Sequence, residues 1–302
     1  MVVDYAALRA VAAVVRSGSF ERAAASLNVT PSAVSQRIKH LEERLGAVLI
    51  ERGTPCTATD KGLALCRHMD RVGMLEKDLM AQLPELAGPE GAGLRVTLNI
   101  ATNADSLGTW FLEAIASFTK ASDYLVNVAI DDEDHTADWL RRGRVLAAVT
   151  SLERPVQGCR VTPLGSLRYQ ATASPDFVAR YFPDGVTEDA FQRAPALTFN
   201  QKDRLQNVWA REVFGHDMSF PTHWLPSTQS FLEGSVAGMG WALNPIQLAK
   251  RHLERGDLVE LVPGKVLERY LFWQINRLAA DQLHELSRSV TSVARRELDS
   301  RA

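Results

Sequence analysis

The first 58 residues carry apolar side chains at the spacing of three short amphipathic helices. The first helix has its apolar residues at i, i+3, i+4 and i+7: Leu8, Val11, Ala12 and Val15. The same spacing recurs over residues 20–27 and 31–45. Ser19 and Thr30 precede these two segments as N-cap residues, and Pro31 occupies a first helical position. The pattern predicts three consecutive helices joined by tight turns.

The polar face of the third predicted helix carries side chains suited to reading DNA. They are Ser32, Ser35, Gln36, Arg37 and Lys39. Short hydroxyls allow close approach to a duplex, Gln hydrogen-bonds adenine, and Lys or Arg binds phosphate or guanine. A small helical bundle with a solvated polar face is the alternative interpretation.

Residues 47–58 are typical of a short hairpin that follows the third helix. An apolar strand, a tip containing glycine and a return strand complete a winged helix-turn-helix. Arg52, near the tip, is placed to reach a minor groove or a phosphate, although it is equally suited to be a solvated turn residue.

A long helix is predicted to follow, with Thr59 as its N-cap. Its apolar residues lie three or four positions apart: Leu65, Met69, Val72, Leu75, Leu79 and Leu83. Such a narrow stripe suits a seam between two chains, or packing on the chain's own domain. Pro84 and the glycine-rich run 88–93 then predict a break and a linker.

Beyond the linker the hydrophobic period changes to that of an α/β domain. Strands are predicted at 94–101, 125–130, 145–150 and 270–275, with helices at 106–118, 136–142 and 281–299. A similar set recurs over 166–262. Alternating strands and helices indicate a parallel sheet with crossover helices, arranged in two lobes with a cleft between them.

Ligands of open α/β sheets lie beyond the carboxyl ends of the strands, which points to a set of candidate effector-binding residues. They are Asn103, Asp105, Ser106, Trp110, Asp132, Thr150, Asn200, Asp203, Thr228 and Gln229. The helix starting near Ser106 would suit an α-carboxylate, and the acidic residues an ammonium or cationic side chain. Alternatively, Asp105 only caps a helix, residues 131–134 form a solvated turn, and Trp110 fills the core.

Composition narrows the function further. The 302 residues carry a net charge of −2, so charge alone does not indicate a nucleic-acid binder. No apolar run is long enough for a membrane span, and the first residues lack a signal-peptide pattern, which predicts the cytoplasm. The three cysteines have no CxxC spacing, and no catalytic or dinucleotide motif is present. We therefore expect neither an enzyme nor a metal or cofactor site.

The run SFERAAASLNVTPSAVSQRIKHLEERLGAVLIER, residues 19–52, resembles the DNA-binding signature of the LysR-type transcriptional regulators. The resemblance implies a winged helix-turn-helix over 1–58, a linker and dimerisation helix over 59–88, and an effector domain over 89–302. That domain would resemble periplasmic binding proteins, with lobe I at about 93–165 and 267–302 and lobe II at about 166–266. Implied partners are operator DNA, RNA polymerase and further copies of the chain, as a dimer of dimers.

Four later segments resemble the ArgP/LysG subgroup: NADSLGTWF, DDEDHTADWLRRG, GCRVTPLGSLRY and GMGWALNP. That resemblance implies a sensor of lysine or arginine that controls genes for amino-acid export or metabolism. Two positions depart from the subgroup pattern, because Gln229 stands where a Glu is expected and Asn244 precedes Pro245. A neutral effector, a replication-inhibitor-like DNA-binding protein and an enzyme on the same fold remain the competing hypotheses.

Overall fold

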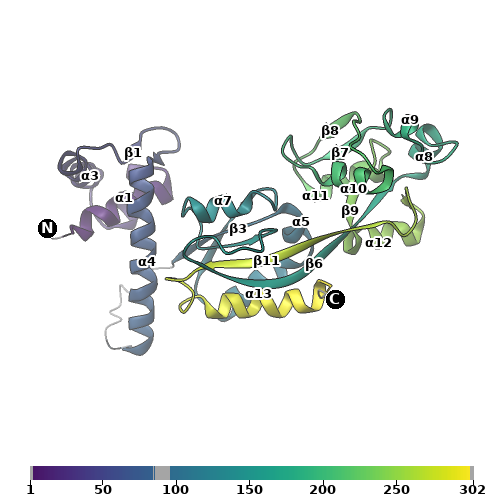
Figure 1. Cartoon of the computed structure of the whole chain (residues 1–302). Helices are drawn as coiled ribbons and strands as arrows, with labels where there is room; N and C mark the ends of the chain where they lie inside the picture. Colours follow the sequence, from purple (N-terminus) through teal and green to yellow (C-terminus); the bar gives the residue numbers. More distant parts are fainter. Residues whose placement is uncertain (1–2, 84, 86–95, 300–302) are drawn as a thin grey trace. The chain divides into compact units, whose positions relative to one another are not determined.

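The computed structural model describes residues 3–83, 85 and 96–299, and it divides into two compact units. The first unit comprises residues 1–98 with 123–125, and the second comprises 99–122 with 126–302. Figure 1 shows the helices of the first unit and the mixed α/β elements of the second. The predicted Pro84 break and the glycine-rich run 88–93 lie outside the described residues.

Three short helices form the start of the first unit, as predicted: α1 (Tyr5–Ser17), α2 (Phe20–Ser26) and α3 (Pro31–Leu45). Ser19 caps α2 by accepting a hydrogen bond from the Arg22 N–H, and Thr30 caps α3 by accepting one from the Ala33 N–H. Gly46 ends α3 in the left-handed conformation, with φ 60°. Local capping chemistry therefore sets the boundaries of these helices.

The predicted wing consists of β1 (Ile50–Glu51) and β2 (Thr57–Ala58), which pair antiparallel. Glu42 on α3 holds its base, because its carboxylate accepts a hydrogen bond from the Leu49 N–H at 2.7 Å. The long helix α4 (Asp60–Gln82) follows, capped by Thr59 as predicted. A Cβ on Gly62 would lie 2.0 Å from the Leu49 carbonyl oxygen, so α4 begins in direct contact with the wing.

The apolar stripe of α4 divides into two parts. Its first part, with Leu65, Met69 and Val72, packs on the core of the three helices. Its second part is uncovered in the chain, where Leu75 and Leu79 are 58% and 48% exposed. Packing on the chain's own domain thus accounts for the first half of the stripe, and the seam between two chains stays a prediction for the second half.

The second unit is built on a mixed seven-stranded sheet. Its strands are β3 (Thr97–Thr102), β4 (Leu125–Ile130), β5 (Ala147–Thr150), β6 (Cys159–Ala173), β9 (Ala242–Pro245), β10 (Val259–Glu260) and β11 (Val266–Asn276). The order is β10-β6-β11-β5-β3-β4, and β9 pairs with β6. The sequence predicted a parallel sheet, but only part of it is parallel: β3 and β5 are parallel, whereas β11 is antiparallel to both β5 and β6. β11 comes from the far end of the chain and enters the sheet between β5 and β6, where it runs against both of them.

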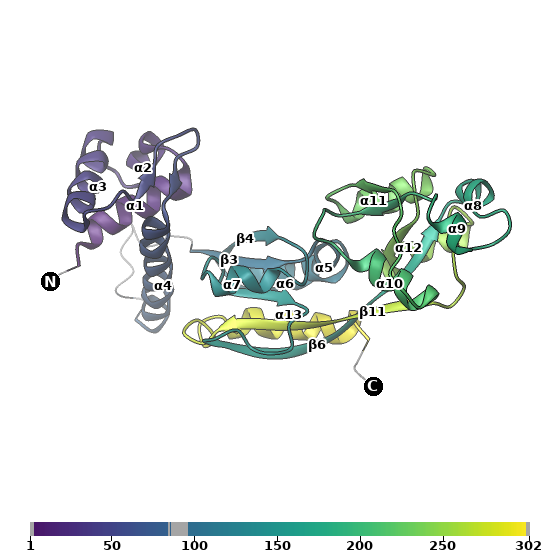
Figure 2. The same ribbon diagram turned by 45° about the horizontal axis from the view of Figure 1, so that its top comes forward.

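Two groups of elements lie at the two ends of β6 and β11 (Figures 1 and 2). We call the first group lobe I: β3–β5 with α5 (Ala104–Ser106), the π-helical turn η3 (Leu107–Phe111), α6 (Leu112–Ala121), α7 (Thr136–Arg141) and α13 (His284–Glu297). Lobe II comprises α8 (Pro175–Tyr181), α9 (Glu188–Phe191), β7 (Ala196–Thr198), α10 (Leu205–Phe214), β8 (Thr222–Trp224), α11 (Thr228–Val236), β9 and α12 (Ile246–Arg255). The predicted lobe boundary at 165–166 falls inside β6.

The paired strands β6 and β11 join the lobes as a two-stranded ribbon. Their register runs from Val266 opposite Gln170 to Asn276 opposite Cys159, with an irregularity at Leu271/Phe272. Gly165 lies opposite this irregularity with φ 128°, a conformation that favours glycine. Next to it, Ser166 and Asp299 exchange backbone hydrogen bonds of 2.9 and 3.2 Å. Asp299 is therefore fastened to the ribbon beside this irregularity.

Candidate functional site

The exposed side of α3 presents the residues predicted to contact DNA. Ser32, Gln36, Arg37 and Lys39 are exposed and Ser35 is half-buried, while Val34, Ile38 and Leu41 on the other side are in the core. The surface residues therefore form a polar stripe on a rigid helix, which the major groove of DNA accepts. The Lys39 ammonium lies 3.8 Å from the exposed Glu43 carboxylate, a weak contact that leaves it available to a phosphate.

The other predicted DNA contacts flank this stripe. Thr30 and Ser19 act first as helix caps, and Pro31 is the first residue of α3. Arg52, in the exposed wing, has its guanidinium 5.2 Å from the centre of the Phe20 ring. This cation–π contact orients Arg52 while leaving it exposed, which is compatible both with the predicted DNA contact and with a solvated turn residue.

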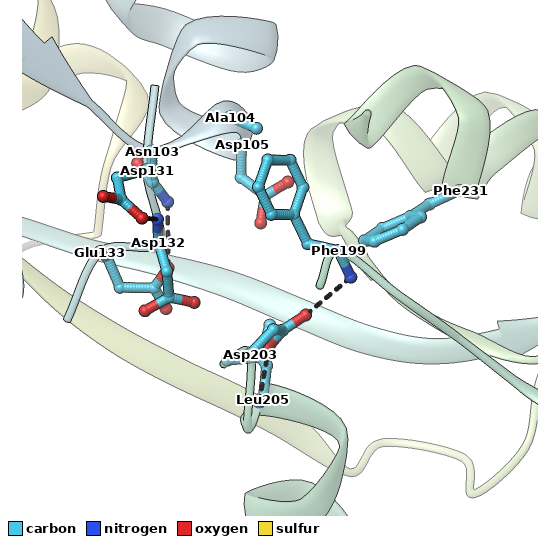
Figure 3. Close-up of a pocket in the computed structure, with 10 residues that line it drawn as sticks. All are labelled: Asn103, Ala104, Asp105, Asp131, Asp132, Glu133, Phe199, Asp203, Leu205 and Phe231. Carbon is cyan, nitrogen blue, oxygen red and sulfur yellow. Dashed lines mark hydrogen bonds between the residues drawn. The ribbon is translucent and has the colours of Figure 1, made fainter. Parts of the chain in front are cut away.

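An acidic pocket lies between the two lobes in the second unit (Figure 3). It is lined by Asn103, Ala104, Asp105, Asp131, Asp132, Glu133, Phe199, Asp203, Leu205 and Phe231. The first six follow strands β3 and β4 of lobe I, and three of the others follow β7 of lobe II. The predicted location beyond the strand ends is thus where a cavity occurs. Its volume is about 20 Å³, enough for about one water molecule.

Asp105 connects the lobes at one side of this pocket. Its carboxylate accepts hydrogen bonds from the Thr228 hydroxyl on α11 at 2.5 Å and from the Tyr169 hydroxyl on β6 at 2.9 Å. Burial raises the pKa of Asp105 to about 6, against the opposing effect of these two hydrogen bonds. The alternative role for Asp105 was that of a helix cap. The cap is instead Asn103, whose side chain accepts a hydrogen bond from the Ser106 N–H. The helix accordingly begins at Ala104, two residues before the predicted start.

Glu133 is buried on the lobe I side of the pocket. Its carboxylate accepts hydrogen bonds from the Arg269 Nε at 3.3 Å and from the Asn103 amide at 3.5 Å. Arg269, on β11, also donates to Asp134 at 2.7 Å. Burial, together with the charge of Asp132, raises the pKa of Glu133, and Arg269 opposes this rise. The Arg269 guanidinium therefore acts as a counter-ion supplied by the protein itself.

Asp203 contributes the acidic charge of lobe II. It accepts hydrogen bonds from the Phe199 N–H at 3.0 Å and the Leu205 N–H at 2.9 Å, which fix its turn. Burial raises the pKa of Asp203, and the pKa of Asp132 across the pocket rises for the same reason, with Asp203 adding to the effect. The Asp203 carboxylate thus disfavours the charged form of Asp132, an effect that a bound cation would relieve.

Five carboxylates line this one cavity, and that charge decides its chemistry. Within the described residues, no group of His, Cys, Asp and Glu side chains is arranged to hold a metal ion. Arg269 is the permanent cation in contact with the cluster, through Glu133. The remaining negative charge favours a small organic cation, and Phe199 and Phe231 supply apolar walls for its carbon chain.

The predicted effector-binding residues divide into two groups. Asn103, Asp105, Asp132 and Asp203 line the pocket, and Thr228 hydrogen-bonds Asp105. The remaining five, which do not line it, are Ser106, Trp110, Thr150, Asn200 and Gln229.

Each residue of the second group has another place in the structure. Trp110 is 1% exposed and packs edge-to-face on Phe111, and Ser106 is buried behind the helix start. The Thr150 hydroxyl donates to the Glu133 carbonyl oxygen, so it positions the loop that bears the acids. The Asn200 side chain accepts a hydrogen bond from the Lys202 N–H of its own turn. The exposed Gln229 side chain donates a hydrogen bond to the Glu233 carboxylate.

Sequence reasoning missed three lining residues: Phe199, Leu205 and Phe231. The strand-end rule covers Asp131 and Glu133, which stand next to the chosen Asp132. Phe231 lies one helical turn inside α11, and no local pattern distinguishes it from a core residue. Arg269 was missed because it comes 136 residues after its partner Glu133.

Comparison with known proteins gives two family matches and several close relatives. Residues 5–63 match the bacterial regulatory helix-turn-helix protein, lysR family, and residues 91–293 match the LysR substrate binding domain. The HTH-type transcriptional regulator ArgP of Pseudomonas fluorescens is 42% identical over 270 residues, 89% of this chain and 90% of that protein.

Two solved structures are also similar to the chain. The C-terminal domains of a LysR family protein from Agrobacterium tumefaciens share 65% identity, with a TM-score of 0.67, over 68% of this chain and all of that one. Full-length LysG from Corynebacterium glutamicum with bound effector Arg shares 33% identity, with a TM-score of 0.66, over 98% of this chain and all of that one. The two family matches together span most of the chain, and they agree with the helix-turn-helix and the mixed-sheet effector unit described above. The chain therefore belongs to the LysR family of bacterial helix-turn-helix transcription regulators, and its relatives include ArgP and LysG.

Proposed function

We propose that the chain senses a basic amino acid, lysine or arginine, in its acidic pocket and adjusts transcription of genes for the export or metabolism of that amino acid. The observation that carries this proposal is the cluster of five carboxylates between the lobes, of which Glu133 is paired with the cation Arg269. The arginine bound to the related LysG of Corynebacterium glutamicum supports the same ligand class.

The pocket geometry suggests how binding is transmitted. A cavity of about 20 Å³ does not hold an amino acid, so the lobes must separate or the lining side chains must rearrange for it to enter. A ligand shifts such an equilibrium only by binding one arrangement more tightly than another. Asp105 and Thr228, one on each lobe, are the contact that such a shift changes.

In this proposal the regulator acts on cytoplasmic DNA as a dimer or a dimer of dimers, with α3 in the major groove and Arg52 on the wing. The exposed Leu75 and Leu79 on α4 supply an apolar surface for pairing two chains. RNA polymerase is the further partner that activation would require. None of the helices in the described part of the chain is long and apolar enough to span a membrane.

Calorimetric titration of the full-length protein with arginine, lysine, citrulline and norleucine tests the proposed ligand class. Citrulline and norleucine approximate the shapes of arginine and lysine but lack the side-chain cation. We expect saturable binding of arginine or lysine and at least about ten-fold weaker binding of the neutral pair, because the carboxylates would be left without a partner. Equal binding of citrulline and arginine would refute the acidic pocket as the sensor of charge.

A further inference from the structure

A second cavity lies beside the acidic pocket and has the opposite charge character. Its volume is about 80 Å³, and its lining includes Asp131, His135, Asp138, Trp139, Arg144 and Lys202. Arg142 adds a third permanent cation to this lining. Asp131 lines both cavities, so the two cavities adjoin at this residue.

The carboxylates of the second cavity are already engaged by the protein. Asp131 accepts hydrogen bonds from the Trp139 indole at 3.0 Å and from the Asp132 N–H at 3.0 Å. Asp138 forms an ion pair with Arg141 at 2.6 Å, which lowers the pKa of Asp138. These contacts leave Arg144 and Lys202 as the cations of the lining that a ligand can reach.

Arg144 and Lys202 face this cavity from different lobes. Arg144 follows α7 in lobe I, with its guanidinium 5.8 Å from the centre of the Trp139 ring. Lys202 belongs to the lobe II turn after β7. Within the described part of the chain, neither side chain forms an ion pair with a carboxylate. Two cations on opposing lobes attract an anion and repel each other without one.

One turn of lobe II serves both cavities. The Asn200 side chain accepts hydrogen bonds from the Lys202 N–H at 2.7 Å and from the Asp203 N–H at 3.3 Å, which fixes the two residues in one turn. Lys202 lines the basic cavity, whereas its neighbour Asp203 lines the acidic pocket. The turn therefore offers a cation and a carboxylate side by side, which matches the two charged ends of an amino acid.

The start of the helix at Ala104, which the sequence suggested for the α-carboxylate, is less favourable for an anion. Asn103 already caps it by accepting from the Ser106 N–H, and the carboxylates of Asp105 and Glu133 lie in the same pocket. A ligand carboxylate there would stand among like charges.

We infer that the basic cavity holds the α-carboxylate of the effector, bridged by Arg144 of lobe I and Lys202 of lobe II, while the acidic pocket holds its cationic side chain. This inference rests on the proposed function and names the subsites within it. A carboxylate that bridges the two lobes binds the closed arrangement better than the open one, so it supplies the differential affinity that switching requires.

Titration of the full-length protein with arginine and with agmatine, which is arginine without its carboxylate, tests the assignment. The variants are Arg144→Met and Lys202→Met, and Arg160→Met is the matched control because Arg160 is an exposed arginine of β6 that pairs with Asp281 and lines neither cavity. Agmatine affinity is measured by displacement of arginine. The wild-type protein should bind arginine more tightly than agmatine. Each test variant should weaken arginine binding by about ten-fold and agmatine binding by less than about two-fold. Arg160→Met should change the affinity for either ligand by less than about two-fold.

The outcomes separate the subsite assignment from the proposed function. Arginine binding that is unchanged in Arg144→Met and Lys202→Met, or weakened by the same factor as agmatine binding, would overturn the carboxylate subsite while leaving the basic amino-acid sensor intact. A wild-type protein that binds neither arginine nor lysine would overturn the proposed function and, with it, the subsite. Loss of arginine selectivity in both test variants, with the control unchanged, would support the assignment.

Discussion

The affinity of the acidic pocket for arginine should fall as the pH is lowered from 7 to 5, because Asp105 takes up a proton in this range. Burial raises the pKa of Asp105 to about 6, so its carboxyl is mostly ionised at pH 7 and mostly protonated at pH 5. The guanidinium of arginine stays charged throughout this range. Protonation therefore removes a negative charge from the pocket while the ligand keeps its positive charge.

The size of the effect follows from the pKa of Asp105. If arginine binds only the ionised form, its apparent dissociation constant rises by a factor of about 11 at pH 5 and by about 1.1 at pH 7, a net change of about ten-fold. The raised pKa values of Asp132 and Asp203 would steepen the dependence in the same direction. The pKa of Glu133, raised to about 8, lies above this window, so Glu133 adds little to the change.

Calorimetry at pH 5, 6 and 7, in two buffers of different ionisation enthalpy, measures both the affinity and the protons released. We expect about 0.9 proton released for each arginine bound at pH 5 and about 0.1 at pH 7. The Asp105→Asn variant should bind arginine more weakly at pH 7 and lose most of the pH dependence, while its amide still reaches Thr228. Circular dichroism at each pH checks that the protein is folded. Affinity that is flat, or tighter at pH 5, would refute the role given to this carboxylate.

Three further predictions concern other parts of the chain. Lys39→Ala and Arg52→Ala should each weaken operator binding in gel-shift titrations, with arginine affinity unchanged. Each variant should also reduce the slope of log affinity against log salt concentration by about one, the value expected for the loss of one phosphate contact. Gly62→Val should lower the free energy of unfolding by more than about 3 kcal/mol in chemical denaturation, because its Cβ would overlap the Leu49 carbonyl oxygen at 2.0 Å. Gln229→Glu should change arginine affinity by less than about two-fold, since the side chain at 229 is exposed and does not line the pocket.

Each of these has a direct control. Arg9→Ala, on α1, tests whether any loss of positive charge in the first unit weakens operator binding as much as Lys39→Ala does, in which case α3 would not be the reading element. Lys61→Val places the same side chain one residue before Gly62, at an exposed position, and an equal loss of stability there would contradict the contact argument. A large gain in arginine affinity in Gln229→Glu would move the binding site toward α11.

The features predictable from the sequence are those fixed by neighbours along the chain. Ser19 and Thr30 cap helices because their hydroxyls accept bonds from N–H groups three residues later, so a short window of sequence contains both partners. The same holds for the polar stripe of α3, whose buried and exposed positions alternate with the helical period. The strand-end rule likewise located Asn103, Asp105, Asp132 and Asp203.

The features missed by the sequence analysis depend on partners far apart in the chain. Thr228 was proposed as a ligand contact, but its bond to Asp105 spans 123 residues and has no local signature. The pair of Glu133 and Arg269 is equally remote, and it became visible only once β11 was found antiparallel beside β6 and β5. The prediction of a wholly parallel sheet was wrong for the same reason. The direction of β11 is set by its partner strands in the fold and cannot be read from its own residues.

The ribbon of β6 and β11 has a practical consequence for measuring the motion of the lobes. Because the backbones of Ser166 and Asp299 are hydrogen-bonded to each other, the end of the described chain is held on the ribbon that joins the two lobes. A fluorophore attached at Asp299 would therefore report little displacement, however far the lobes swing. Dyes on exposed positions of α7 in lobe I and α8 in lobe II, both away from the ribbon, would convert the same motion into a large change in energy transfer.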